Sequence, residues 1–299
     1  LNRELPQLPK NLQYINLSLP TEIYSSDGER IKILGERHPI ALEDIAPYFT
    51  KAIIAVEDSR FYRHSGIDHK GLLRALWTNL RQKRIAQGGS TITQQLSKNL
   101  FFSFERNWVR KIKELLIAFQ LEASFSKGQI LQAYCNQIYF GNGAYGVEEA
   151  AQVYFRKRAK DLTLYQAALL AGLPNSPNNA NPFAHYERAM QRTKYVLNRM
   201  VSENLISVDE KELALQSDID LVKPRVESNP NLYFVDQVLA QIEKDYGKEF
   251  VHFGGLKIVT TLDTRYQKLA YKSARNHLEA LEGRIVKESR AGPLQAALV

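Results

Sequence analysis

The feature that most constrains this chain is a helical hydrophobic pattern that continues through residues 42–217 with few strand signals. Apolar residues recur three and four positions apart over stretches of helical length. Helices with one apolar face become stable by packing against one another. The sequence therefore predicts a mainly α domain, with helices over residues 45–60, 70–84, 106–125, 127–136, 147–155, 164–173 and 185–203.

The flanking segments follow other patterns. Residues 21–26 and 30–34 are short apolar runs on either side of Asp27-Gly28, which is typical of a β-hairpin. The polar stretch 217–231 contains two prolines and predicts a linker. A helix over 233–246, a strand over 256–262 and a helix over 264–281 are expected after it. We therefore expect an N-terminal extension with a β-hairpin (1–41), the helical domain (42–217) and a small α+β segment (218–299).

Composition narrows the class of partner. The net charge of +8 favours an acidic partner, which is nucleic acid, a phosphate or an anionic membrane surface. No apolar run approaches the ~18 residues of a membrane span.

Cys135 is the only cysteine, which excludes an internal disulfide, and its apolar surroundings predict an inert buried thiol. Because the chain starts without Met and stops within an apparent strand, we interpret it as a piece of a longer polypeptide with a membrane anchor upstream.

Glu57 opens the string Glu-Asp-Ser-Arg-Phe-Tyr-Arg-His-Ser-Gly over residues 57–66. If residues 57–64 are helical, Glu57, Phe61 and His64 share one face. The apolar run before Glu57 predicts a partly buried carboxylate, whose pKa rises toward that of a useful general base. The alternative is a surface glutamate beside a core phenylalanine and a packed histidine.

The string Gln-Gly-Gly-Ser-Thr-Ile-Thr-Gln-Gln over residues 87–95 predicts a helix start capped by Ser90 or Thr91. Free backbone N–H groups at such a start suit a phosphate. The alternative is an ordinary capped helix.

Glu114 closes a basic string that contains Arg110, Lys111 and Lys113. Arg110 and Glu114 are spaced for a solvated ion pair worth only a few tenths of a kcal/mol. However, the apolar residues 115–119 follow directly, so we expect Glu114 at the edge of the core. Two carboxylates, one beside dense positive charge, indicate glycosyl chemistry with an anionic leaving group: one removes a proton and the cations hold the departing phosphate.

No residues form a recognisable metal motif or a nucleotide-binding loop. Ser124-Phe125-Ser126-Lys127 matches the S-x-x-K motif of penicillin-reactive enzymes. No Lys-Thr-Gly accompanies it, so we interpret the match as chance.

Together the strings resemble the family 51 peptidoglycan glycosyltransferases, the polymerising domain of class A penicillin-binding proteins. The ordered motifs occupy residues 57–66, 87–95, 110–114, 127–136 and 192–200. Three residues depart from the family pattern: Gln132 replaces a Glu, Cys135 replaces a Leu and Arg156 stands where Gly is common. Residues 218–299 resemble the linker and the start of a truncated transpeptidase domain, so no transpeptidase activity is expected from this chain.

The resemblance implies a lysozyme-like fold with two lobes around a groove, and lipid II and a growing glycan as substrates. Glu57 would deprotonate the acceptor 4-hydroxyl, with inversion at the donor and release of undecaprenyl pyrophosphate, while Glu114 and its cations would position the pyrophosphate. A divalent metal, Mg²⁺ or Mn²⁺, is compatible with this chemistry, and no organic cofactor is expected. The implied substrate-binding residues are Asp58, Phe61, His64, Gly89, Ser90, Thr91, Gln94, Gln95, Lys98, Arg110, Lys111, Lys113 and Asn136.

The resemblance also implies work on the outer face of a bacterial cytoplasmic membrane, with other cell-wall synthesis proteins as partners and without nucleic acid. The apolar and basic residues of 70–84, with Phe101, Phe102 and Phe104, predict a surface that lies on the membrane. Three alternatives stay open: a lysozyme-type hydrolase, which has no need for three cations beside its second carboxylate, a non-catalytic basic helical module, and a degenerate family member acting as a scaffold.

Overall fold

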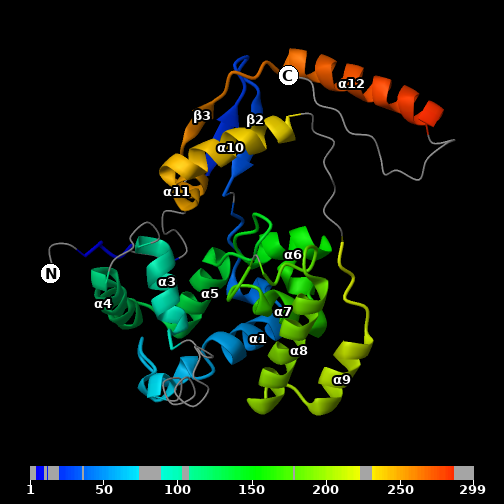
Figure 1. Cartoon of the computed structure of the whole chain (residues 1–299). Helices are drawn as coiled ribbons and strands as arrows, with labels where there is room; N and C mark the ends of the chain where they lie inside the picture. Colours follow the sequence, from blue (N-terminus) through cyan, green and yellow to red (C-terminus); the bar gives the residue numbers. More distant parts are fainter. Residues whose placement is uncertain are drawn as a thin grey trace. The chain divides into compact units, whose positions relative to one another are not determined.

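The computed structural model describes residues 5–9, 12, 20–35, 37–73, 89–102, 108–177, 179–222 and 231–285. The chain divides into two compact units (Figure 1). The helical unit comprises Leu1–Leu17 and Glu36–Pro224, and the α+β unit comprises Ser18–Gly35 and Arg225–Val299. Helices account for most of the described elements, which confirms the predicted mainly α class.

The helical unit is built around a buried helix, α7 (Leu164–Gly172). Nearly every residue of α7 is buried, and a helix that is apolar on all sides is stable only inside a bundle. It packs against both α1 and α8, while α3 packs against α4 and α5. The other elements are η3 (Leu42–Asp44), α1 (Pro47–Glu57), η4 (Phe61–Arg63), α3 (Ile92–Phe101), α4 (Trp108–Ser124), α5 (Lys127–Gln137), α6 (Val147–Phe155), η5 (Ala159–Asp161), α8 (Tyr186–Ser202) and α9 (Val208–Gln216).

Four of these helices begin with a capping box, in which a Ser or Thr and the residue three positions on satisfy each other's backbone N–H groups. The pairs are Thr91 with Gln94, Ser126 with Gln129, Thr163 with Gln166 and Ser207 with Glu210. Ser126, an inner residue of the S-x-x-K match, therefore serves as the cap of α5. Helix α5 runs unbroken through the two departures Gln132 and Cys135. Cys135 is fully buried, as predicted, and burial raises the pKa of its thiol.

The α+β unit contains the predicted hairpin. Strands β1 (Thr21–Tyr24) and β2 (Arg30–Leu34) pair antiparallel, and Gly28 in the turn has a φ of +85°. Strand β3 (Lys257–Val259) adds to β1 in parallel, so the sheet order is β2-β1-β3. Helices α10 (Leu232–Tyr246), α11 (Lys248–Phe253) and α12 (Thr264–Ile285) complete the unit. Its core is Ile23, Leu34, Val235, Leu239 and Val251.

Helix α1 ends at Glu57, three residues before the predicted end at residue 60. Residues 57–64 do not form one continuous helix, so the shared helix face considered for Glu57, Phe61 and His64 does not form. Asp58 leaves the helical region, with φ −159° and ψ 72°, and a short 3₁₀ turn follows at Phe61–Arg63. The Asp58 carboxylate accepts hydrogen bonds from the His64 ring and from the Ile92 backbone. These tertiary contacts satisfy Asp58 outside the helix and divert the chain there.

Helix α4 is present. The spacing of Val109, Ile112, Leu116 and Phe119 predicts that these residues form its apolar stripe toward the core. This is wrong for three of them, because Val109, Ile112 and Phe119 are 49%, 54% and 46% exposed. The buried face instead contains Glu114, Ile117 and Leu121, spaced i, i+3 and i+7. Both faces carry apolar residues, so periodicity alone could not choose the one that packs on the core.

The predicted helix over 70–84 lies largely outside the described residues, which stop at residue 73 and resume at 89. Leu72 and Leu73, at its described start, are exposed. Phe102, predicted for the same membrane surface, is buried in the core with Phe101 packed against it, so that part of the prediction is wrong, and Phe104 lies outside the described residues. Among the described helices, none has the length and hydropathy to cross a membrane.

Arg156 is expected to strain the end of α6. It has a φ of +52° in the left-handed region, which glycine adopts without penalty and which glycine commonly occupies just after a helix. We expect Arg156→Gly to raise the free energy of unfolding by about 1 kcal/mol, because left-handed backbone is unfavourable for a residue with a Cβ. Urea unfolding measures this difference. Arg156→Lys keeps the charge and the strain, so a gain of equal size in that variant would contradict the backbone explanation.

Candidate active site

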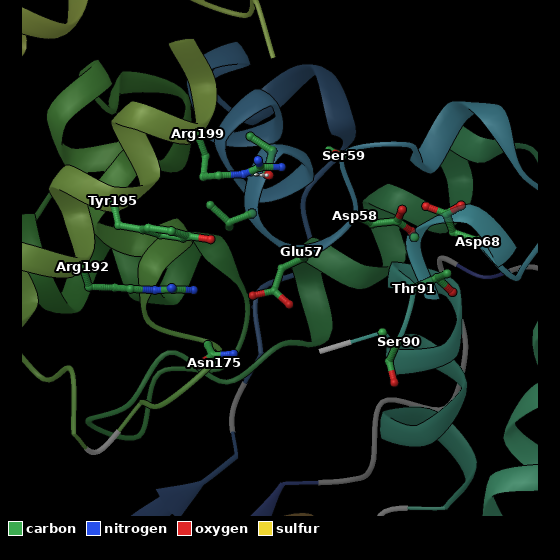
Figure 2. Close-up of a pocket in the computed structure, with 14 residues that line it drawn as sticks. Glu57, Asp58, Ser59, Asp68, Ser90, Thr91, Asn175, Arg192, Tyr195 and Arg199 are labelled. Atoms are coloured by element: carbon green, nitrogen blue, oxygen red, sulfur yellow. Dashed lines mark hydrogen bonds between the residues drawn. The ribbon is translucent and has the colours of Figure 1, made fainter. Parts of the chain in front are cut away.

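One pocket of the helical unit gathers residues that are far apart in the sequence (Figure 2). The end of α1, the residues just before α3, the loop after α7 and one face of α8 contribute to it. Its lining residues are Ala55, Val56, Glu57, Asp58, Ser59, Asp68, Gly71, Gly89, Ser90, Thr91, Asn175, Arg192, Tyr195 and Arg199. Five of the predicted site residues, Glu57, Asp58, Gly89, Ser90 and Thr91, therefore share one pocket.

Glu57 is the last residue of α1, and Figure 2 shows its side chain between Arg192 on α8 and Ser90. Its Oε2 accepts a hydrogen bond of 2.9 Å from Gln95 Nε2. Its Oε1 is buried and has no hydrogen-bond partner among the described residues. One carboxylate oxygen is thus held in place, and the other remains able to accept a proton.

Burial dominates the electrostatics of Glu57 and raises its pKa above the ordinary value. The hydrogen bond from Gln95 and the charge of Arg192 lower the pKa. The nearby Asp58 charge raises it. A buried carboxylate with a raised pKa is a stronger proton acceptor than an exposed one, which suits a general base.

Asp58 and His64 form a buried pair rather than two free substrate ligands. The His64 Nε2 lies 3.0 Å from both Asp58 carboxylate oxygens, and Asp58 Oδ2 also accepts from the Ile92 backbone N–H at 3.1 Å. The Phe61 ring is fully buried and packs edge-on against His64. These three predicted residues join the end of α1 to the start of α3, and Asp58 also lines the pocket.

The start of α3 is closed by its own cap. Gln94 N–H donates to Thr91 Oγ1 at 3.2 Å, and Thr91 N–H donates to Gln94 Oε1 at 3.1 Å. The Thr91 hydroxyl donates to the Gly66 carbonyl at 2.6 Å. With Ile92 N–H bound to Asp58, three backbone donors that we expected to be free for a phosphate are already engaged. Gly89 and Ser90, ahead of the cap, keep access to the pocket.

Glu114 lies at the core edge as predicted, with only 1% of its surface exposed. It accepts hydrogen bonds from Arg110 Nη1 and, at 3.1 Å, from Lys111 Nζ. Lys111 Nζ also donates to Ser90 Oγ at 3.1 Å. Because Ser90 lines the pocket of Glu57, this bond connects the cations of α4 to that pocket.

Three further predicted residues lie elsewhere. Asn136 bonds both backbone groups of Ile40, at 3.1 and 2.9 Å, and so fastens the segment before α1 to α5. Lys98 is exposed on α3, and Lys113 precedes Glu114 on α4. In the part of the chain that the structure describes, no three His, Cys, Asp or Glu side chains form a group that could hold a metal ion.

Helix α8 supplies pocket residues that the sequence reasoning missed. Arg192, Tyr195 and Arg199 are spaced i, i+3 and i+7 and therefore share one face. The Arg192 guanidinium carbon lies 4.7 Å from the Tyr195 ring centroid. The aliphatic part of the Arg192 side chain passes close to Gly172, where an added Cβ would meet Arg192 Cγ at 2.9 Å. The helical spacing of Arg192 and Arg199 within the last motif was the sequence signal that could have placed them in the site. No sequence pattern marked Asn175, which lies in the loop after α7, as a pocket residue.

Comparison with known proteins identifies relatives over most of the chain. The family model described as "Transglycosylase" matches residues 27–201. Penicillin-binding protein 1A of Aquifex aeolicus is 44% identical over 279 residues, which cover 93% of this chain and 38% of that protein. Penicillin-binding protein 1A of Neisseria gonorrhoeae is 41% identical over 278 residues, which cover 91% of this chain and 35% of that protein. The chain thus spans somewhat more than a third of the length of these relatives.

Among solved structures, the crystal structure of penicillin-binding protein 1A from Haemophilus influenzae is similar, with a TM-score of 0.46 and 27% sequence identity. The match covers 93% of this chain and 31% of that one.

Proposed function

Since this chain belongs to the transglycosylase family, we propose that it polymerises lipid II into β-1,4-linked glycan as the glycosyltransferase part of a class A penicillin-binding protein. The donor is a growing glycan on undecaprenyl pyrophosphate. The acceptor is the sugar 4-hydroxyl of lipid II.

One observation carries this proposal: the same pocket holds a proton-accepting carboxylate and reaches a cluster of cations. Glu57 Oε1 has no partner among the described residues, and Ser90, in the same pocket, accepts from Lys111. A sugar hydroxyl at Glu57 and a phosphate near Ser90 are therefore compatible with one bound geometry. This is the arrangement that glycosyl transfer from a pyrophosphate requires.

The chemistry follows from these positions. Glu57 takes the proton of the acceptor hydroxyl, whose oxygen attacks the anomeric carbon of the donor. The bond to pyrophosphate breaks from the opposite side, so an α-linked donor gives a β product. Arg110 and Lys111 meet the negative charge of the departing pyrophosphate, and Glu114 holds both cations in place before the substrate arrives.

A divalent metal accompanying the pyrophosphate, Mg²⁺ or Mn²⁺, would be held mainly by phosphate oxygens. The carboxylates of Asp58 and Glu114 already accept hydrogen bonds from protein groups, and the described residues offer no cluster of metal ligands. The cations of α4 provide the charge stabilisation within the protein itself.

A lysozyme-type hydrolase fits the second carboxylate less well. A glycosidase uses its second carboxylate as a nucleophile toward the sugar or as a base toward water. Both Glu114 oxygens are instead engaged by cations, Oε1 by Arg110 and Oε2 by Lys111, which suits a carboxylate that orients a phosphate site. Incubation with lipid II and with finished glycan separates the two activities by their products.

Glu57→Gln is expected to abolish polymerisation while stabilising the fold. The amide cannot take a proton, and loss of a general base lowers rates by about 10²–10⁴-fold. Labelled lipid II, with separation of polymer from monomer, measures the activity. Near-normal turnover by the folded variant would end the assignment of Glu57.

The same variant makes a prediction about pH. Burial raises the pKa of Glu57 in the folded chain, so the carboxyl favours folding below its unfolded pKa and loses that contribution as the pH rises through the folded pKa. The neutral amide avoids this loss. Glu57→Gln should therefore melt above the parent at pH 7, with a difference that disappears near pH 4. The same difference in melting temperature between the parent and the variant at pH 7 and at pH 4 would contradict this prediction.

Arg110→Ala and Lys111→Ala are expected to weaken the donor side. Each removes a charge-assisted contact to pyrophosphate, so we expect a rate loss of about tenfold or more and weaker binding of a phosphoglycolipid inhibitor of the family. Inhibitor titration measures the affinity. Arg158→Ala is the matched control, because Arg158 pairs on the surface with Asp161 at 3.0 Å and does not line the pocket. Unchanged affinity in both test variants would refute a shared phosphate site.

We place this domain on the outer face of the bacterial cytoplasmic membrane, together with other cell-wall synthesis proteins. The lipid tail of the substrate stays in the bilayer while its sugars enter the pocket. The exposed apolar side chains of α4, Val109, Ile112 and Phe119, lie on the helix that also carries Arg110 and Lys111. An apolar stripe next to cations is the arrangement of a helix that lies at an anionic interface.

The chain is therefore expected to bind anionic vesicles, with salt weakening the binding but not eliminating it. Replacing Ile112 and Phe119 by Ser should reduce sedimentation with the vesicles, because apolar area is lost. Val208→Ser with Leu213→Ser removes equally exposed apolar residues from α9 and serves as the control. Absence of any association at low salt would refute the interfacial surface.

A further inference from the structure

A chain of two hydrogen bonds leads from the buried core to Glu57. Tyr134 Oη donates to Gln95 Oε1 at 3.0 Å. Gln95 Nε2 donates to Glu57 Oε2 at 2.9 Å. The three side chains come from α5, α3 and α1, so the chain crosses the interior of the helical unit.

We propose that Tyr134 is a positioning residue for the catalytic base: its hydroxyl fixes the Gln95 amide so that the amide N–H holds one oxygen of Glu57 and leaves the other for the acceptor hydroxyl. This inference rests on the proposed function, in which Glu57 takes a proton. Tyr134 itself does not line the pocket and acts only through Gln95.

Tyr134 is well placed for this task because it is rigid. Its side chain is fully buried on α5, which begins with a capping box and packs against α3. Burial raises the pKa of the Tyr134 phenol well above its usual value, so it keeps its proton at every pH at which a glutamate titrates. The phenol is therefore a permanent donor.

The amide of Gln95 needs such a partner. Its two ends are nearly equal in shape but opposite in function, since one donates and the other accepts. A donor at Oε1 keeps that end away from Glu57 and polarises the amide, which strengthens the N–H bond to the carboxylate. Without the phenol, the partly buried Oε1 of Gln95 loses its donor, and the side chain is stabilised by turning toward another donor.

The effect on Glu57 follows from the groups that surround it. Burial raises its pKa, Asp58 at the end of α1 adds to this, and Arg192 on α8 opposes it. Asp68, Tyr195 and Arg199 line the same pocket. The bond from Gln95 lowers the Glu57 pKa, so loosening that bond raises the pKa and misplaces the carboxylate.

Tyr134→Phe tests the proposal, because it removes the hydroxyl and keeps the ring. We expect the acid limb of the pH–rate profile to move up by roughly 0.5–1 pH unit, with kcat reduced and KM little changed. Gln95→Leu should shift the limb at least as far, and the double variant should shift it no further than Gln95→Leu alone. A purely structural role for Tyr134 predicts a lower rate with the parental pH profile and additive effects.

Tyr154→Phe is the matched control. Tyr154 is equally buried and donates to the Phe140 carbonyl at 2.9 Å, so the substitution removes a buried tyrosine hydrogen bond with no connection to Glu57. Its pH profile should match that of the parent. A shift of equal size in Tyr154→Phe would mean that loss of core stability is responsible.

Titration of the carboxyl separates this inference from the proposed function. In protein labelled with ¹³C at glutamate carboxyls, the Glu57 resonance is the one missing from Glu57→Gln, and its pKa is measured without any substrate. A higher pKa in Tyr134→Phe than in the parent supports the positioning role, whether or not the chain polymerises lipid II. An unchanged pKa overturns it, even if the parent is an active polymerase that Glu57→Gln inactivates.

Discussion

The site depends on the buried carboxylate of Asp58. One side chain ends helix α1, accepts from the His64 ring and accepts from the backbone at the start of α3. A buried carboxylate without partners would be strongly unfavourable, so these bonds fix where the two helices meet. Glu57 is the residue just before this junction. Its position at the pocket follows from the way its neighbour is satisfied.

Hydrophobic periodicity predicted most of the helical unit because its helices are ordinary amphipathic or buried ones. Prediction failed where tertiary contacts decide. Helix α1 stops at Glu57 because Asp58 bonds to residues that follow it by six and by thirty-four positions. The outward face of α4 was mistaken for the inward one, since both carry apolar residues. The parallel pairing of β1 with β3 joins segments more than 230 residues apart, and no local pattern marks it.

The predicted site residues divide into two physical classes that share the same motifs. Glu57, Ser90 and Lys111 present groups to the pocket or to its rim. His64, Gln94 and Asn136 are engaged by protein partners. A motif shows that certain residue types occur together, but it does not show which side chains face the pocket and which bind other parts of the protein. In α8 the opposite occurred: Arg192 and Arg199 line the pocket, although the sequence analysis used their motif only for the family resemblance and did not predict them as site residues.

Glu57 and Glu114 show how the surroundings assign different tasks to the same residue type. Both are largely withdrawn from water. Glu57 has one amide donor, and Arg192 acts on it only through its charge, so burial dominates and the pKa of Glu57 rises, which favours uptake of a proton. Glu114 is held by Arg110 and Lys111, so its charge is matched within the protein and serves to orient two cations. The division into a base and an anion-binding partner is thus set by the donors around each carboxylate, and in the case of Glu57 that donor is Gln95.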